Sequence, residues 1–234
     1  MPPLFSRAVD DTRDVIELAL FPLPNVVLFP RIHCPLHVFE PRYRQMTAAA
    51  LSGSRAIGMA TVRPEHVREM AGDPPLFTIG CMGTVQQAER RPDGRYDIVL
   101  LGTKRFRIER EIPRSGERLY RIAQVELLDE RLDEAREGIA LQGLRADAID
   151  LLTRLLRAVA PDAAHQLDPR RFSGIDDTTF VSALCQMLDL PAAEKQGLLE
   201  ADGPVVRCQQ LVALLEFRLA ELGGGVPARG DRLH

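Results

Sequence analysis

The sequence is poor in the features of a general nucleic-acid-binding protein. It has no tryptophan and three tyrosines in 234 residues, and its net charge is −3. Proteins that hold single strands of RNA or DNA usually combine a positively charged surface with aromatic side chains on which bases stack. The composition therefore argues against a global basic field for nucleic acid and leaves only local basic patches to consider.

Signals for membrane insertion and secretion are also absent. No apolar run reaches the length of about 18 residues that a spanning helix needs. The N-terminal stretch MPPLFSRAVDDTRD carries acidic residues where a signal peptide would need an apolar core. No CxxC spacing links the four cysteines, which suits free thiols in a reducing compartment better than a disulfide framework. We therefore expect a cytoplasmic protein that has no membrane partner.

Motifs of common catalytic sites are missing as well. The chain has no GxxxxGK[ST] phosphate loop and no HExxH zinc motif. Paired carboxylates such as Asp10-Asp11 and Asp176-Asp177 fall at a terminus or at an expected helix start, where solvation and capping explain them. We expect no catalytic residue, no metal site and no cofactor.

The most informative stretch that is present runs from Leu20 to Tyr43. It holds five prolines, which rule out a continuous helix because each removes a backbone donor and restricts the residue before it. The apolar runs from Val26 to Phe29 and from Leu36 to Phe39 have the length of short strands between these prolines. Because proline is tolerated mainly at sheet edges, we expect this stretch to form a folded-over edge of a β domain.

The rest of the first half has β patterning with one helix. Proline at its start and glycine at its end predict a helix from Pro41 to Gly53. The segment 64–75 is rich in breakers and charge, which predicts a loop with one helical turn and a place for partner contact. Apolar and alternating runs predict further strands at Val15 to Phe21, Arg55 to Val62, Leu76 to Glu89, Tyr96 to Leu101, Arg105 to Glu111 and Leu119 to Leu128.

The second half changes to helical spacing. Apolar residues recur at helical intervals from Leu132 until Pro161 stops the pattern, and Asp176 or Asp177 can cap a second helix. A third helix is expected from Pro191, and a fourth from Gly203-Pro204 to the glycines that begin at Gly223. Four helices with short connections predict a bundle or a bundle-like cap on the sheet.

Three motifs resemble the N-terminal, substrate-binding domain of Lon proteases, especially the free-standing bacterial proteins that consist of this domain. The first is LFPLPNVVLFP followed by PLHVFEPRY, within residues 20–43. The other two are the stretch from Ile79 to Val85, which contains Gly83-Thr84-Val85, and the run from the Asp93-Gly94-Arg95 hairpin to Gly102-Thr103-Lys104-Arg105-Phe106. The resemblance covers Val15 to Asp129 well and the helical half more loosely.

This resemblance implies an α+β fold: a PUA-like β pseudo-barrel of about six strands with one interposed helix, followed by about four helices. We expect a flexible lead-in over residues 1–14, the β domain over 15–130, the helical domain over 131–223 and a flexible tail over 224–234. The chain lacks the ATPase and peptidase modules of the full protease. The resemblance thus implies a non-enzymatic module that binds unfolded or exposed protein segments, as an adaptor or regulator in proteolysis or protein quality control, with a protease or chaperone as a further partner.

The proline-rich stretch also supplies the candidate binding residues. An exposed sheet edge with an apolar groove could take up an extended peptide by strand addition. We assign peptide binding to Phe29, Arg31, His33, Phe39 and Tyr43. Core packing is the competing use of the three aromatic residues.

Two alternative functions stay open at this stage. His33, Cys34, His37 and Glu40 are metal-ligand types close together in sequence, although Pro35 keeps the two histidines off a helical spacing. A basic cluster also gives the β domain a possible RNA surface, because PUA-like barrels often bind RNA, although acidic neighbours favour a solvated face. The cluster comprises Arg42, Arg44, Arg90, Arg91, Arg95, Lys104, Arg105 and Arg107.

Overall fold

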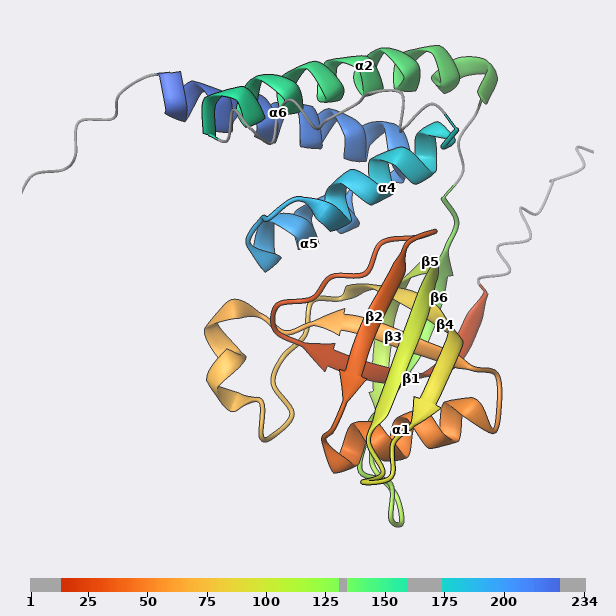
Figure 1. Cartoon of the computed structure of the whole chain (residues 1–234). Helices are drawn as coiled ribbons and strands as arrows, with labels where there is room; N and C mark the ends of the chain where they lie inside the picture. The colour runs from red at the N-terminus through yellow and green to blue at the C-terminus, as the bar shows by residue number, and fades with distance from the viewer. Residues whose placement is uncertain (1–13, 131–133, 160–173, 224–234) are drawn as a thin grey trace, which may run out of the picture.

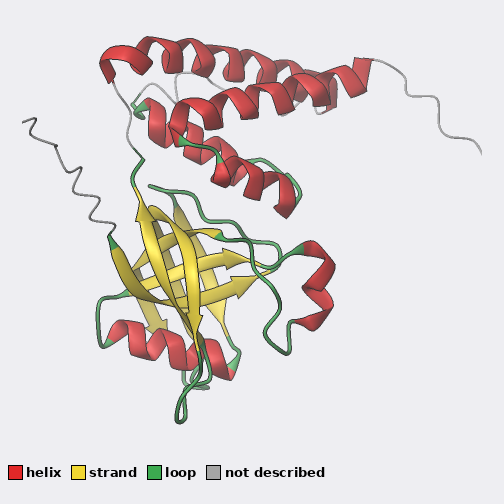
Figure 2. Cartoon of the chain, turned by 180° about the vertical axis from the view of Figure 1, so that it is seen from behind, coloured by secondary structure: helices red, strands yellow, loops and turns green. Residues whose placement is uncertain are grey.

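The computed structural model describes residues 14–130, 134–159 and 174–223. The chain first builds a β barrel and then a group of helices that covers one end of the barrel (Figures 1 and 2). Within these described ranges, six strands are followed by four helices in the second half, so the expected α+β class is confirmed.

Five of the six strands close into a ring, and the sixth is attached at one edge. The sheet order is β2-β5-β4-β3-β1-β6, with an additional β5–β6 pairing that closes the ring. The first half of β5 pairs with β2, whereas its second half pairs with β6. The strands are β1 (Val15–Leu23), β2 (His33–Val38), β3 (Ala56–Thr61), β4 (Ile79–Arg90), β5 (Tyr96–Ile112) and β6 (Arg121–Leu128).

Helices occupy both ends of the barrel (Figure 1). Helix α1 (Pro41–Leu51) follows β2 and packs under the barrel, and the 3-10 helix η1 (Pro64–Glu69) lies in the connection between β3 and β4. The helices at the other end are α2 (Glu134–Val159), α4 (Asp177–Met187), α5 (Ala192–Glu200) and α6 (Gly203–Gly223).

Local signals in the sequence explain where these helices begin. Pro41 stands in the first turn of α1, where its missing N–H has no intrahelical partner to lose. Asp176 caps α4 by accepting a hydrogen bond of 3.0 Å from the backbone N–H of Thr179. Gly203 has a left-handed φ of 83°, which glycine adopts without strain, and it turns the chain after α5 at the first residue of α6.

Apolar packing joins the two halves of the molecule. The larger cluster of buried side chains includes Phe29 and Met46 from the β half together with Leu141 and Leu211 from the helices. A smaller cluster around Phe106 fills the other part of the barrel. The helices therefore complete the core that the barrel leaves open.

A buried ionic cluster reinforces this junction. The Glu130 carboxylate lies 2.7 Å from Nε of Arg105 and also accepts hydrogen bonds from Arg207. Arg105 Nη1 donates to the carbonyl of Ala201 at 2.7 Å, and Arg207 Nε donates to the carbonyl of Leu198 at 3.0 Å. Both arginines thus satisfy carbonyl groups at the C-terminal end of α5, which attracts positive charge.

Two details of the predicted strands are wrong. Residues 26–29 form no strand. Val27, Leu28 and Phe29 are buried: Leu28 lies against Gly83 and Gly102 of the barrel, and the backbone N–H of Phe29 donates to the side chain of Gln186 of α4 at 3.2 Å. The two strands predicted on either side of Gly102 are one continuous strand, β5, which changes its partner from β2 to β6 near this glycine.

Several predictions concern residues outside those that the structure describes. The flexible lead-in, except for residue 14, and the flexible tail fall there, as does the helix stop at Pro161. The division into a β domain and a helical domain stays a prediction.

Candidate functional site

Strand β2 has one free edge in the described sheet, because it pairs only with β5. Ile32, the residue just before β2, accepts a hydrogen bond of 2.9 Å at its carbonyl from the N–H of Gly102 in β5. Backbone groups alternate in direction along an antiparallel strand, so the even-numbered residues of β2 face β5. His33, Pro35 and His37 therefore turn their backbone groups to the free edge, where Pro35 loses no hydrogen bond by lacking an N–H.

The outer face of the sheet beside this edge has an apolar centre. Figure 1 shows β2, β5 and β4 on the side facing the viewer, with the helices above them and α1 below. A groove of about 580 Å³ lies on this face, lined by Pro35 and His37 on one side and Gln87 and Ala88 on the other. The strand register forms three rows: His33–Leu101–Thr84, Pro35–Val99–Gln87 and His37–Asp97–Glu89.

A polar cluster fixes the C-terminal end of this groove. Nδ1 of His37 lies 2.6 Å from Oδ1 of Asp97, and Nε of Arg91 donates to Oδ2 of Asp97 at 2.6 Å. The hydrogen bonds with His37 and Arg91 hold the pKa of Asp97 below its ordinary value, so the carboxylate stays ionised. The cluster thereby ties β2 to the hairpin between β4 and β5.

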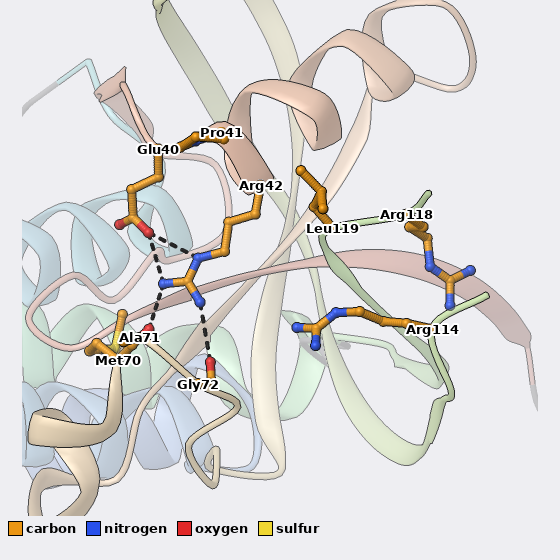
Figure 3. Close-up of a pocket in the computed structure, with 9 residues that line it drawn as sticks. All are labelled: Glu40, Pro41, Arg42, Met70, Ala71, Gly72, Arg114, Arg118 and Leu119. Atoms are coloured by element: carbon orange, nitrogen blue, oxygen red, sulfur yellow. Dashed lines mark hydrogen bonds and ion pairs between the residues drawn. The ribbon is translucent and has the colours of Figure 1, made fainter. Parts of the chain in front are cut away.

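A second cavity, the α1 pocket, opens where the free edge of β2 ends. It has a volume of about 550 Å³ and is formed by three segments that lie far apart in the sequence (Figure 3). These are the start of α1, the turn after η1, and the connection between β5 and β6. The lining residues are Glu40, Pro41, Arg42, Met70, Ala71, Gly72, Arg114, Arg118 and Leu119.

Arg42 fastens the turn after η1 to the start of α1. Its Nε donates to Oε2 of Glu40 at 2.9 Å, and its two Nη atoms donate to the carbonyls of Gly72 at 3.2 Å and Met70 at 2.6 Å (Figure 3). These contacts hold one wall of the pocket in place without a helix or strand there.

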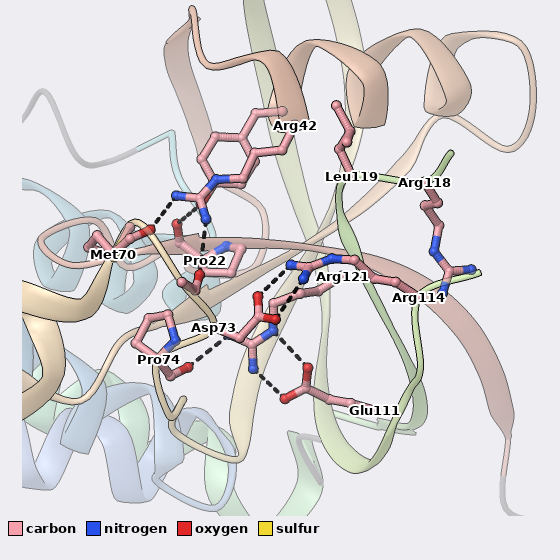
Figure 4. A network of polar contacts seen from close by, with 12 residues as sticks. Pro22, Arg42, Met70, Asp73, Pro74, Glu111, Arg114, Arg118, Leu119 and Arg121 are labelled. Atoms are coloured by element: carbon pink, nitrogen blue, oxygen red, sulfur yellow. Dashed lines mark hydrogen bonds and ion pairs between the residues drawn. The ribbon is translucent and has the colours of Figure 1, made fainter. Parts of the chain in front are cut away.

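Two further ion pairs hold the opposite wall (Figure 4). Arg114 pairs with Asp73, with one contact of 2.7 Å, and the nearly buried Arg121 pairs with Glu111. Arg121 Nη1 also donates to the carbonyl of Pro74 at 2.8 Å. The turn after η1 is therefore linked to the barrel from both sides.

Comparison with known proteins agrees with this architecture. The family described as the ATP-dependent protease La (LON) substrate-binding domain matches residues 17–216. This chain belongs to that family. The match includes the β2 edge, the α1 pocket and most of the helical half.

Relatives of this Lon-family chain are longer proteins. The Lon protease of Escherichia coli K12 is 26% identical over 205 residues, which are 87% of this chain and 25% of that protease. The chain thus spans about a quarter of the curated relative that it matches.

Solved structures share the fold of this Lon-family member. A Lon N-terminal domain protein from Xanthomonas campestris gives a TM-score of 0.56 at 23% identity, covering 85% of this chain and 98% of that one. The N-terminal domain of a Lon protease from the Mycobacterium avium complex gives a TM-score of 0.60 at 18% identity, covering 88% and 99%. No helix in the described ranges is long and apolar enough to cross a membrane.

The five predicted peptide-binding residues divide into two groups. Phe29 and Tyr43 are buried in the core, where the Tyr43 hydroxyl donates to the carbonyl of Pro22 at 3.1 Å and burial raises its pKa to about 12. Arg31, His33 and Phe39 are exposed. The structure therefore places three of the five along the surface and uses the other two as packing beneath it.

The residues of the suggested metal site do not converge. Cys34 is buried and faces the core, whereas His33 and His37 are on the outer face. The Glu40 carboxylate forms an ion pair with Arg42, and the His37 imidazole contacts the Asp97 carboxylate. Within the described ranges, no group of three His, Cys, Asp or Glu side chains could hold a metal ion.

Ion pairs also neutralise most of the basic cluster. Six of its eight members lie within ion-pair distance of a carboxylate, and little unpaired positive charge is left for a nucleic acid. The pairs are Arg42–Glu40, Arg91–Asp97, Arg95–Asp93, Lys104–Asp129, Arg105–Glu130 and Arg107–Glu126.

Sequence reasoning missed the residues that complete the α1 pocket. It marked 64–75 as a place for partner contact, and Met70 and Gly72 lie there. It gave no role to Arg114, Arg118 or Leu119, because their position next to α1 follows from the closure of the barrel rather than from any local pattern.

Proposed function

We propose that this Lon-family member is a non-enzymatic module that binds extended segments of other polypeptides. The segment lies along the free edge of β2 and is paired with it through backbone hydrogen bonds. The observation that carries this proposal is the open edge itself: backbone groups of His33, Pro35 and His37 point away from the sheet. The family description as a substrate-binding domain supports a polypeptide as the ligand.

Backbone pairing explains how such a site takes segments of different sequence. The free edge offers the N–H groups of His33 and His37 and the carbonyls of all three outward-facing residues. Folded proteins use most of their backbone groups internally, whereas an unfolded segment has them free. The edge therefore selects for unfolded or locally exposed chains.

Side chains near the edge add apolar contact area. Phe39 follows β2 directly and is 58% exposed, and its ring stacks on that of His37 with 6.2 Å between the ring centroids. Arg31 and His33 flank the other end of the edge. A bound segment would contact these residues with alternate side chains.

Pro35 limits what the edge can bind. It removes the central N–H of the free edge, and proline on an edge strand hinders sheet-to-sheet aggregation between copies. We therefore expect this edge to bind polypeptide segments weakly and reversibly. Such binding suits an adaptor or regulator that passes bound proteins to a protease or chaperone.

Substitution of His37 by proline tests the backbone pairing. The change removes an N–H that faces away from β5, so the sheet keeps its own hydrogen bonds. We expect binding of reduced, carbamidomethylated α-lactalbumin to weaken about 3- to 10-fold, since one hydrogen bond contributes roughly 0.5–1.5 kcal/mol. Fluorescence anisotropy with the labelled unfolded chain measures this change.

Two controls make the result specific. His37→Ala removes the imidazole but keeps the N–H, and it should bind within about 2-fold of the unchanged protein, because the lost pair with Asp97 is exposed. Native α-lactalbumin should not bind. Equal losses in both His37 variants would show that the side chain, not the backbone, makes the contact, and no binding of the unfolded chain would refute the proposed function.

A further inference from the structure

The α1 pocket has more positive charge than its own carboxylates neutralise. Three arginines and one glutamate line it. Arg42 is paired with Glu40, and Arg114 is paired with Asp73. Arg118 has no carboxylate partner among the described residues, so the charge of its guanidinium is unbalanced.

Arg118 also has an unused hydrogen-bond donor. Its Nη2 donates to the carbonyls of Ile112 at 3.3 Å and Pro113 at 2.7 Å. Its Nε is buried and has no hydrogen-bond partner in the described part of the chain. A buried donor without an acceptor is unfavourable, so an acceptor that lets this side chain turn and pair would be favoured.

The walls beside Arg118 are partly apolar. Leu119 is 49% exposed, and Met70 is half-buried across the pocket. A guanidinium next to exposed apolar carbons suits a ligand with a carboxylate on a short hydrocarbon stem. The volume of about 550 Å³ leaves room for one or two side chains.

The position of the pocket connects it to the polypeptide site. Glu40 comes two residues after Val38, the last residue of β2. A segment that continues past the end of the β2 edge therefore arrives at the α1 pocket. The fixed turn after η1 keeps the pocket formed before any ligand is present.

We propose that the α1 pocket binds a carboxylate of the captured polypeptide and that Arg118 is its main partner. This inference rests on the proposed function, because it takes the ligand to be a segment lying along β2. The carboxylate belongs either to the C-terminus of the bound chain or to an aspartate or glutamate side chain. Both present the same planar anion, which arginine pairs with two parallel hydrogen bonds.

Three synthetic ten-residue peptides of one extended, otherwise neutral sequence separate these sources. The first has a free C-terminal carboxylate, the second is its C-terminal amide, and the third is the amide with one glutamate. We expect the protein to bind the first or the third about 10-fold more tightly than the plain amide. The preference should shrink as NaCl rises, because salt screens charged contacts near the surface.

Variants identify the arginine. Arg118→Gln should remove the carboxylate preference and leave binding of the plain amide unchanged, while Arg118→Lys should keep part of the preference. Arg154→Gln on α2 is the matched control: it removes the same charge from an exposed side chain outside the pocket, and it should keep the full preference. Thermal melts of all variants check that they fold.

The outcomes distinguish this inference from the proposed function. Equal binding of the three peptides by the unchanged protein would overturn the carboxylate site and leave strand addition intact. A preference that persists in Arg118→Gln would also overturn the assignment. Failure of all three peptides to bind would overturn both proposals.

Discussion

At the scale of single residues, two neighbouring acids have opposite environments. Asp129 pairs with Lys104 at the surface, with side chains that are 48% and 45% exposed. Glu130 pairs with Arg105 and Arg207, whose side chains are 4% and 0% exposed. Exposed pairs contribute little to stability, whereas removing one member of a buried pair leaves an uncompensated charge.

Two isosteric substitutions test this difference. Glu130→Gln should lower the free energy of unfolding by about 3–5 kcal/mol, because two buried arginines lose their shared carboxylate. Asp129→Asn should lower it by less than about 1 kcal/mol. Urea unfolding at pH 7 measures both, and similar effects of the two changes would contradict the account of the junction.

The contribution of Glu130 should depend on pH in one direction. Burial alone would raise its pKa, but the hydrogen bonds and charge of Arg207, together with Arg105, outweigh burial and bring its pKa below the ordinary value. A lowered pKa stabilises the fold above the unfolded value of about 4.3, and this stability is lost as pH falls through the folded value. The stability gap between the unchanged protein and Glu130→Gln should therefore be constant down to about pH 5 and shrink in stronger acid.

At the scale of the elements, Gly102 is the point where β5 changes partners. Arg31, with a left-handed φ of 69°, and Ile32 both form backbone hydrogen bonds with Gly102. A Cβ atom at residue 102 would collide with the carbonyl oxygen of Phe29, which is backbone and cannot turn away. Only glycine allows this close approach of the segment before β2.

Gly102→Ala should therefore destabilise the protein by about 1–3 kcal/mol, as in other overpacked sites. Gly143→Ala is the control, since a Cβ there meets nothing within 4 Å in the exposed face of α2. It should stabilise the helix by roughly 0.5–1 kcal/mol. Thermal unfolding of both variants gives the comparison, and a neutral Gly102→Ala would show that the two segments can separate without loss.

Predictions from the sequence are confirmed where residues within an element determine its structure locally. Prolines before and within β2 predict a sheet edge, and Asp176 predicts the start of α4, because each acts through its nearest backbone groups. The strand prediction fails for residues 26–29, whose unbroken apolar run reflects burial between the barrel and a distant helix. The sequence also predicts two strands in place of β5, because a glycine at position 102 is typical of a strand end. Only the pairing of β5 with β2 on one side of Gly102 and with β6 on the other shows that the strand continues.

The candidate site was predictable only in part, for the same reason. Exposed Arg31, His33 and Phe39 are close to a recognisable proline-rich edge. Burial of Phe29 and Tyr43 follows from packing that the local pattern does not reveal. Arg118 becomes important only because the barrel closes and carries the β5–β6 connection to α1.

At the scale of the whole molecule, the helices leave the proposed binding surface open. They cover one end of the barrel, while the β2 edge runs along its side towards α1 (Figure 1). The ionic cluster around Glu130 and the shared apolar core hold the two parts together without covering this edge. A segment can therefore bind without separating the barrel from the helices.

Amide hydrogen exchange tests strand addition most directly. Site-resolved exchange is measured with and without reduced, carbamidomethylated α-lactalbumin. We expect the amides of His33 and His37 to exchange more slowly in the complex, because both are donors at the free edge. Those of Cys34 and Leu36, already facing β5, should change little. Binding that leaves the His33 and His37 amides unprotected would contradict the proposed mode of recognition.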